Sequence, residues 1–181
     1  TYTLPDYQTQ CGCADIMMHT MERYFVLEDT MEITDKIAQD VMKNVMKYAK
    51  ILKKDPENYE ARAEIMWCGS LSHNGLTGCG TCGGDWATHL IEHELGGMFD
   101  VAHGARLAAV WGSWARYVMD EKPERFAQFA VDVMGVEESD DVKSTALKGI
   151  EAVEEFYRMI EMPTNMKELG INPTDEQIKD M

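Results

Sequence analysis

The chain has 181 residues, of which 45% are hydrophobic and 27% are charged, and these proportions fit one globular domain with a core of useful size. Its formal net charge of −15 argues against a nucleic-acid or anionic-membrane partner, because both are bound through clustered Lys and Arg. No apolar run approaches the ~18 residues of a membrane-spanning helix, and no basic, apolar signal peptide opens the chain.

The sequence predicts helices almost throughout, because Ala, Met, Glu, Lys and Leu abound and alternating β-branched runs are absent. Asp55 and Pro56 separate two of them and cap the second, Pro123 lies just inside another, and Thr174 and Gln177 form a capping box. In chain order, the predicted helices cover about 9–27, 32–53, 57–71, 85–98, 104–119, 123–135, 140–160 and 163–169, with a last one from 174. We therefore expect one all-α helical bundle.

A glycine-rich loop, residues 75–84, joins the third and fourth predicted helices. It lacks the Lys of a phosphate-binding loop, and no strand precedes it, so it matches no nucleotide fingerprint. We interpret it as a flexible surface connection, with a loop that lines a substrate or nucleotide cleft as the alternative. Asp85 ends the loop and is expected near the N-cap of the next helix.

Five cysteines, an odd number, favour a reduced cytoplasmic protein over a disulfide framework. Cys79 and Cys82 form a CxxC pair, and Cys11 and Cys13 form a CxC pair. A structural zinc site needs two well-spaced pairs, and a redox CxxC is expected in a βαβ setting that this sequence does not show. We interpret these cysteines as loop and core thiols.

Three of the five histidines lie close together in the sequence, which predicts a metal site. His89 and His93 are four residues apart and therefore share one face of a helix. His103 follows beside Gly104, a residue that lets another backbone come close. Convergent imidazoles at such spacing bind transition metals, and spacing alone selects His89 and His93 as the ligand pair.

The first predicted helix offers a second polar pair. Asp15 and His19 also lie four residues apart, and the residues around them are apolar, so the pair needs a partner or an exposed position. One Asp with three His makes a mixed oxygen and nitrogen ligand set that suits Fe²⁺ or Zn²⁺ with one position open. The fifth histidine, His73, lies at a predicted helix end and is interpreted as a cap or surface residue.

Two alternatives use less of this pattern. The order His89, Glu92, His93 fits the H-x-x-E-H motif of one zinc peptidase class, in which Glu92 is the general base. That interpretation leaves Asp15, His19 and His103 without a role. The other alternative is a helical metal-binding module without catalysis.

Residues 13–25, 83–96 and 100–104 together resemble the iron-containing (group III) alcohol dehydrogenases, with the greatest likeness to the NAD(P)H-dependent butanol dehydrogenase branch. The resemblance follows the chain in order over essentially its whole length. It implies that residues 1–181 are the single helical, metal-binding C-terminal domain of a dehydroquinate synthase-like fold. It further implies a fragment that lacks the N-terminal dinucleotide-binding domain and is clipped after Met181. Alone, this fragment is expected to bind metal without dehydrogenase activity.

The resemblance assigns roles position by position. Asp15 and His19 match the family's D-x-x-x-H, His89 matches the first His of its H-x-x-x-H, and His103 matches its H-G pair. These four side chains would bind a divalent metal, Fe²⁺ first, with Zn²⁺ and Ni²⁺ as alternatives. His93 matches the family histidine beside the nicotinamide and substrate, which makes it a catalytic and cofactor-contacting residue instead of a ligand.

The implied activity is hydride transfer between NAD(P)H and short-chain aldehydes or alcohols. The nicotinamide supplies the hydride chemistry, and the protein supplies position and charge. Trp86, Phe99 and Trp111 are candidates for the wall of a pocket for short alkyl substrates, although each also suits core packing. The expected partners are the small substrate, the missing nucleotide-binding domain and a second copy in a homodimer.

Overall fold

The computed structural model describes residues 2–27 and 31–181, and all regular structure in them is helical. The predicted all-α fold is therefore confirmed. In chain order the α-helices are α1 (Asp6–Tyr24), α2 (Glu32–Lys54), α3 (Tyr59–His73), α4 (Ala87–Met98), α5 (His103–Val118), α6 (Pro123–Asp132), α7 (Val142–Met159), α8 (Met166–Leu169) and α9 (Asp175–Asp180). Two short 3₁₀ turns, η1 (Leu76–Gly78) and η2 (Met119–Glu121), follow α3 and α5.

The predicted helix boundaries differ from the observed ones for local reasons. α1 starts at Asp6, before the predicted Thr9, because Pro5 fits the position that precedes a helix. α3 is capped by Asn58, whose side chain accepts the Ala61 N–H, so the prediction that Asp55 and Pro56 cap it is wrong. The capping box that opens α9 is confirmed by both of its side-chain hydrogen bonds.

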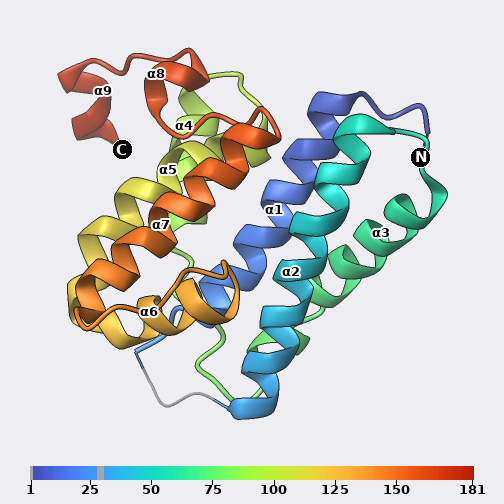
Figure 1. Cartoon of the computed structure of the whole chain (residues 1–181). Coiled ribbons are helices and arrows are strands. Elements are labelled where there is room, and N and C mark those ends of the chain that lie inside the picture. Colours follow the sequence, from blue (N-terminus) through green and yellow to red (C-terminus); the bar gives the residue numbers. More distant parts are fainter. Residues whose placement is uncertain (1, 28–30) are drawn as a thin grey trace.

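α1 is the element that joins the two parts of the bundle (Figure 1). It packs against α2 and α3 on one side and against α5 on the other. α5 in turn contacts α4, α7 and α8, and α6 packs along α7. A helix with neighbours on both sides buries most of its surface, and α1 accordingly buries Met17, Met18 and Met21 completely.

The polar residues of α1 therefore lie inside the protein or at its edge. Glu22 has no exposed surface, and the side chains of Asp15 and His19 keep only 20% and 19% of theirs. Burial of polar groups is unfavourable unless partners satisfy them. The partners of these three residues come from α3, α4 and α5, and they define the candidate site described below.

A buried ion pair fixes α6 to α2 and to the end of α1. Arg125 donates from Nη1 to Asp35 Oδ2 at 2.6 Å and from Nη2 to Asp35 Oδ1 at 2.7 Å. Its Nε donates to the Tyr24 carbonyl oxygen at 2.9 Å, and the guanidinium lies 3.5 Å from the centroid of the Tyr24 ring. The planar guanidinium thus joins three helices through one side chain.

The cysteines occupy the two environments that were predicted. Cys11, Cys13 and Cys68 are buried, whereas Cys79 and Cys82 are exposed, and all five are free thiols. Burial raises the pKa of the Cys13 thiol to about 12 and that of Cys68 to about 11, which suppresses their reactive thiolate forms. A search of the described helices for a span long and apolar enough to cross a membrane finds none.

Candidate metal centre

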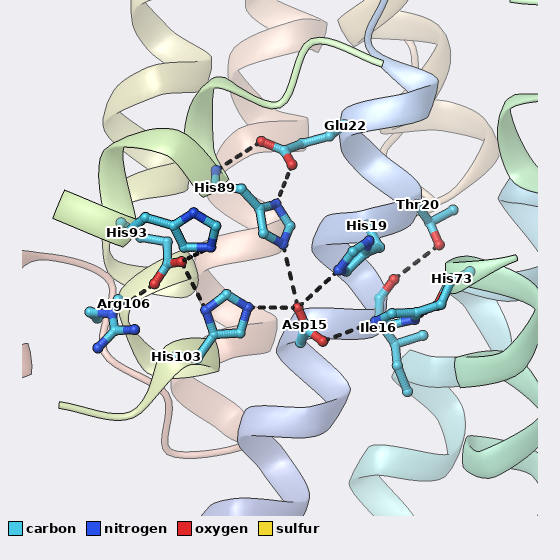
Figure 2. Close-up of polar contacts among 12 residues, drawn as sticks. Asp15, Ile16, His19, Thr20, Glu22, His73, His89, His93, His103 and Arg106 are labelled. Atoms are coloured by element: carbon cyan, nitrogen blue, oxygen red, sulfur yellow. Dashed lines mark hydrogen bonds and ion pairs between the residues drawn. The ribbon is translucent and has the colours of Figure 1, made fainter. Parts of the chain in front are cut away.

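One carboxylate oxygen forms the middle of the candidate site (Figure 2). Asp15 Oδ1 lies 3.5 Å from His19 Nε2, 3.5 Å from His89 Nε2 and 3.2 Å from His103 Nε2. The three imidazoles come from α1, α4 and α5, so the packing of α1 between its neighbours creates the cluster. The structure thus brings together the Asp and the three His that the sequence analysis selected as metal ligands.

The distances around Asp15 Oδ1 are those of a metal's ligand shell. Metal–ligand bonds of 2.0–2.2 Å in a tetrahedral site separate neighbouring ligand atoms by about 3.4 Å. The three distances from Asp15 Oδ1 lie close to that value. Asp15, His19 and His89 each place a ligand atom within 4.8 Å of the other two. His103 touches Asp15 but is also part of a second cluster, described below.

His89 gives the most direct sign that a cation belongs in this cluster. Its Nδ1 faces the Glu22 carboxylate, and its Nε2 is buried, faces Asp15 and makes no geometrically sound hydrogen bond within the described residues. A proton on Nδ1 leaves Nε2 with a lone pair that points toward a carboxylate oxygen. Two acceptors in that position need a cation or a second proton between them. The donor set present therefore fits a divalent metal ion.

In the absence of a metal, protons on His89 and His103 balance the negative charge of the neighbouring carboxylates. Burial works to raise the pKa of Asp15, but the contacts with the imidazoles of His103 and His89 outweigh it and hold this pKa far below its usual range. Burial works to lower the pKa of His89, yet contacts with Asp15 and Glu22 raise it to about 9. Contacts with Asp15 and Glu92 raise the pKa of His103 to about 9. Ionised carboxylates therefore surround His89 and His103 and favour positive charge there.

His19 behaves differently from the other two imidazoles. Burial lowers its pKa to about 4, together with the neighbouring rings of His73 and His89 and against the attraction of Asp15. The neutral ring keeps a lone pair available, which is the form of imidazole that binds metals.

His73 is an exposed residue at the end of α3, as its interpretation as a surface residue predicted, and it is also part of this environment. It is the last residue of α3, but its Nε2 lies 3.2 Å from Asp15 Oδ2. Its ring centroid is 3.9 Å from that of His19. His73 therefore contacts the second oxygen of Asp15 and leaves Oδ1 to the three other imidazoles. The sequence carried no sign of this contact, because it depends on how α3 packs against α1.

A second cluster surrounds Glu92, which has no exposed surface. Its Oε1 lies 2.8 Å from His103 Nδ1 and 3.1 Å from His93 Nε2, and its Oε2 accepts a hydrogen bond from Arg106 Nε at 2.7 Å. His93 keeps 60% of its side chain exposed. The accessible His93 therefore lies beside the Asp15 cluster without joining it, as Figure 2 shows.

This arrangement contradicts both interpretations based on spacing alone. His89 and His93 fall into different clusters, so they do not form one ligand pair. The peptidase alternative also needs Glu92 as a free base, whereas Arg106 and His103 hold it in a buried position. Two side chains on one face of a helix bind the same metal only if the neighbouring helices place the other ligands beside both of them, and here the neighbours of His89 and His93 differ.

The three proposed wall residues have separate positions. Trp86 lies with its ring centroid 5.3 Å from His19 and 5.3 Å from His89. Phe99 is partly buried and packs against the core. Trp111 has no exposed surface and packs near Phe25. Trp111 exposes no surface in this chain, so its observed position is the core packing that was given as its other use.

The glycine-rich loop is held in place and leads to Trp86. Thr34 donates to the Cys79 carbonyl oxygen at 2.8 Å, and the Asp85 N–H donates to the Glu22 carbonyl oxygen at 3.1 Å. Thr77 within the loop is buried. The Asp85 side chain accepts the Ala87 N–H, but Asp85 lies one residue before the observed N-cap of α4. That N-cap is Trp86, whose backbone φ of 66° is in the left-handed region. The loop thus sets the position of an aromatic ring beside the metal cluster.

Gly104 allows the close approach that its position beside His103 predicted. A Cβ at Gly104 would collide with the Cys11 carbonyl oxygen on α1. Replacement of Gly104 by Ala is therefore expected to separate α5 from α1, lower the free energy of unfolding by about 1–3 kcal/mol and weaken Zn²⁺ binding through His103. Urea denaturation and Zn²⁺ titration measure the two effects.

Gly12 offers the matched control for this substitution. It also lies in a helix, but a Cβ added there would meet no atom within 4 Å, so Gly12→Ala is expected to be neutral or mildly stabilising. A Gly104→Ala protein with unchanged stability and Zn²⁺ affinity contradicts the proposed role of this contact.

Comparisons with known proteins identify the family that this chain resembles. The C-terminal model of the Fe-containing alcohol dehydrogenase family matches residues 9–181. NADH-dependent butanol dehydrogenase A of Clostridium acetobutylicum is 35% identical over 172 residues, which cover 94% of this chain and 44% of the relative. NADPH-dependent aldehyde reductase YqhD of Escherichia coli is 34% identical over 173 residues, which cover 95% of this chain and 44% of the relative.

A solved structure agrees with the fold as well. The crystal structure of NADH-dependent butanol dehydrogenase A from Thermotoga maritima superposes with a TM-score of 0.92 at 37% identity, over 99% of this chain and 44% of that one. The chain thus spans less than half the length of these relatives.

Proposed function

This chain belongs to the Fe-containing alcohol dehydrogenase family, and on that premise we propose that it is the metal-binding part of an NAD(P)H-dependent alcohol dehydrogenase. The proposed reaction interconverts short-chain aldehydes and alcohols. The names of the relatives support it, since they include butanol dehydrogenases and an aldehyde reductase. The observation that carries the proposal is the convergence of His19, His89 and His103 on one oxygen of Asp15.

We propose Asp15, His19, His89 and His103 as the ligands of a divalent metal, Fe²⁺ first, with Zn²⁺ and Ni²⁺ as alternatives. A metal ion held there would supply Lewis acidity toward the oxygen of an aldehyde or alcohol. The ionised Asp15 would balance part of the ion's charge, and three neutral imidazoles would leave the ion a net positive charge. Four side chains from three helices would hold such an ion rigidly.

The residues around the ligands have complementary roles. We propose that His93, whose side chain is 60% exposed while its Nε2 lies 3.1 Å from Glu92 Oε1, exchanges a proton with solvent and contacts the cofactor. Trp86 meets His19 and His89 in edge-to-face contacts, and we propose that its apolar ring limits water there and favours an alkyl substrate. The nicotinamide and the second domain that binds it belong to the rest of the proposed enzyme, and a homodimer stays a prediction.

Free thiols at all five cysteines support a cytoplasmic location.

The proposal predicts two different results for the chain alone and for a chimera. Alone, the 181-residue chain is expected to bind one equivalent of Zn²⁺ or Fe²⁺ and to leave NADH and NADPH unoxidised in the presence of butyraldehyde, because it covers only 44% of the length of the butanol dehydrogenase relative. Joined to the N-terminal part of the Thermotoga maritima butanol dehydrogenase, it is expected to oxidise the nicotinamide. Calorimetry and the absorbance of the nicotinamide measure the two results.

The matched control is the same chimera with Asp15→Asn, which is expected to be inactive. Oxidation of NADPH by the chain alone contradicts the division of roles. A folded chimera that binds metal and NADH without activity favours the alternative of a non-catalytic metal-binding module.

A further inference from the structure

Glu22 is a buried carboxylate on the side of His89 opposite Asp15. We infer that Glu22 is a positioning residue for the metal centre, which fixes the backbone, the ring orientation and the tautomer of His89 together. The inference rests on the proposed metal centre and assigns it a group beyond the four ligands. It predicts that Glu22 controls metal affinity through His89 alone.

The contacts of Glu22 carry this inference. Oε1 accepts the backbone N–H of His89 at 3.1 Å, and Oε2 contacts the ring Nδ1 of the same residue. Figure 2 shows the His89 ring between the two acidic side chains of α1, Glu22 and Asp15. These two residues are seven apart, which is two helical turns, so one face of α1 holds both nitrogens of His89.

The carboxylate also determines which nitrogen faces the metal position. A carboxylate only accepts hydrogen bonds, so when a metal is bound the one proton of the His89 ring lies on Nδ1 and the lone pair on Nε2 is free for the metal. Nε2 is the buried atom that faces Asp15 at 3.5 Å. Outer carboxylates that accept from a ligand histidine fix its tautomer and increase its basicity toward the metal.

The same side chain anchors the start of α4. The N-cap residue Trp86 provides no side-chain cap, and Glu22 supplies an acceptor for the free N–H of His89 in the first turn. Its negative charge lies at the positive end of the helix. The Glu22 carbonyl oxygen adds a third contact by accepting the Asp85 N–H. His89 is thereby held at both backbone and ring relative to the helix that carries Asp15.

Nothing else in the described part of the chain accounts for a carboxylate at this place. The hydrogen bonds that the Glu22 carboxylate accepts there come from His89 only. The adjacent Arg23 donates instead to the carbonyl oxygens of His19 and Ser72. A buried charge is unfavourable without strong partners, so an apolar residue would serve packing alone better.

The test is Glu22→Gln in three backgrounds, with Zn²⁺ affinity measured by competition with a chromophoric chelator. Gln keeps the shape but presents one acceptor and one donor to two N–H groups, so one contact becomes repulsive. With all ligands present, and also in the His103→Ala background, the substitution is expected to lower Zn²⁺ affinity roughly 10- to 100-fold. In the His89→Ala background it is expected to have no effect on Zn²⁺ affinity, because the imidazole through which Glu22 acts on the metal is gone.

Two further measurements separate positioning from loss of structure. Glu94→Gln, an exposed change on the same helix as His89, is the control and is expected to leave Zn²⁺ affinity unchanged. The visible spectrum of bound Co²⁺ is expected to change in Glu22→Gln while the far-ultraviolet circular dichroism stays that of the parent. If His89→Ala binds Zn²⁺ too weakly to measure, an unchanged Co²⁺ spectrum in Glu22→Gln overturns the inference.

If Glu22→Gln lowers Zn²⁺ affinity equally in the His89→Ala background, the inference about Glu22 is overturned, since a general structural effect does not depend on His89. The inference is also overturned if Glu22→Gln leaves Zn²⁺ affinity unchanged with all ligands present. Failure of the proposed metal centre itself is distinguishable, because Asp15→Asn and His89→Ala would then leave Zn²⁺ binding intact.

Discussion

Replacement of Asp15 by Asn is expected to lower the affinity of the chain for Zn²⁺ by about 10³-fold, which corresponds to about 4 kcal/mol. Asp15 Oδ1 is the one atom that all three candidate ligand nitrogens contact. The substitution removes the negative charge that attracts the ion. It also presents a neutral amide to the imidazoles that face Asp15 Oδ1. Competition with a chelator of known affinity measures the change.

The control for this substitution is Asp40→Asn on α2, where the side chain is 78% exposed and pairs only loosely with Lys43. It removes the same charge at a distance from the cluster and is expected to leave Zn²⁺ affinity unchanged within a factor of about two. Thermal denaturation gives a second measurement, because an ion bound only to the folded state raises the melting temperature of the parent and not of Asp15→Asn. An affinity for Zn²⁺ within about tenfold of the parent contradicts the ligand role of Asp15.

The sequence was sufficient to predict the helices and the polar pair that α1 contributes to the candidate site. The i, i+4 pair of Asp15 and His19 signalled that a mostly apolar helix needs polar partners, and the structure supplies them from α3, α4 and α5. The capping box at Thr174 and Gln177 was equally local and is confirmed. Such features depend on a few neighbouring residues, which is why periodicity and capping rules identify them.

The separation of His89 from His93 could not be predicted from spacing. Both lie on one face of α4, but the side chain of His89 is 8% exposed and that of His93 is 60% exposed. The difference comes from α1, which covers only the first turn of that face and brings Glu22 to it. The resemblance to a known family assigned these residues to different roles, whereas helical periodicity treats them as equivalent.

His73 and Glu22 were missed for the same reason. The single signal for Glu22 is its position seven residues after Asp15, which puts both carboxylates on one face of the same predicted helix. His73 gave no signal, because its contact with Asp15 depends on the packing of α3 beside α1. Residues that surround a site from other elements become visible only when the fold is known.

The largest expected effect on stability comes from the buried pair of Asp35 and Arg125. Asp35→Ala is expected to lower the free energy of unfolding of the metal-free chain by about 3–5 kcal/mol, since it leaves the guanidinium of Arg125 buried without its carboxylate. The side chains are 9% and 4% exposed, so water replaces the lost contact poorly. Equilibrium urea denaturation measures the change.

An exposed ion pair provides the matched comparison. Asp120 and Lys143 lie 2.8 Å apart with side chains that are 64% and 56% exposed, so Asp120→Ala is expected to cost less than about 1 kcal/mol. The double substitution Asp35→Leu with Arg125→Met is expected to recover much of the loss, because it removes both charges from the interior. If Asp35→Ala unfolds at the same urea concentration as Asp120→Ala, α6 is held to α2 by apolar packing and not by this ion pair.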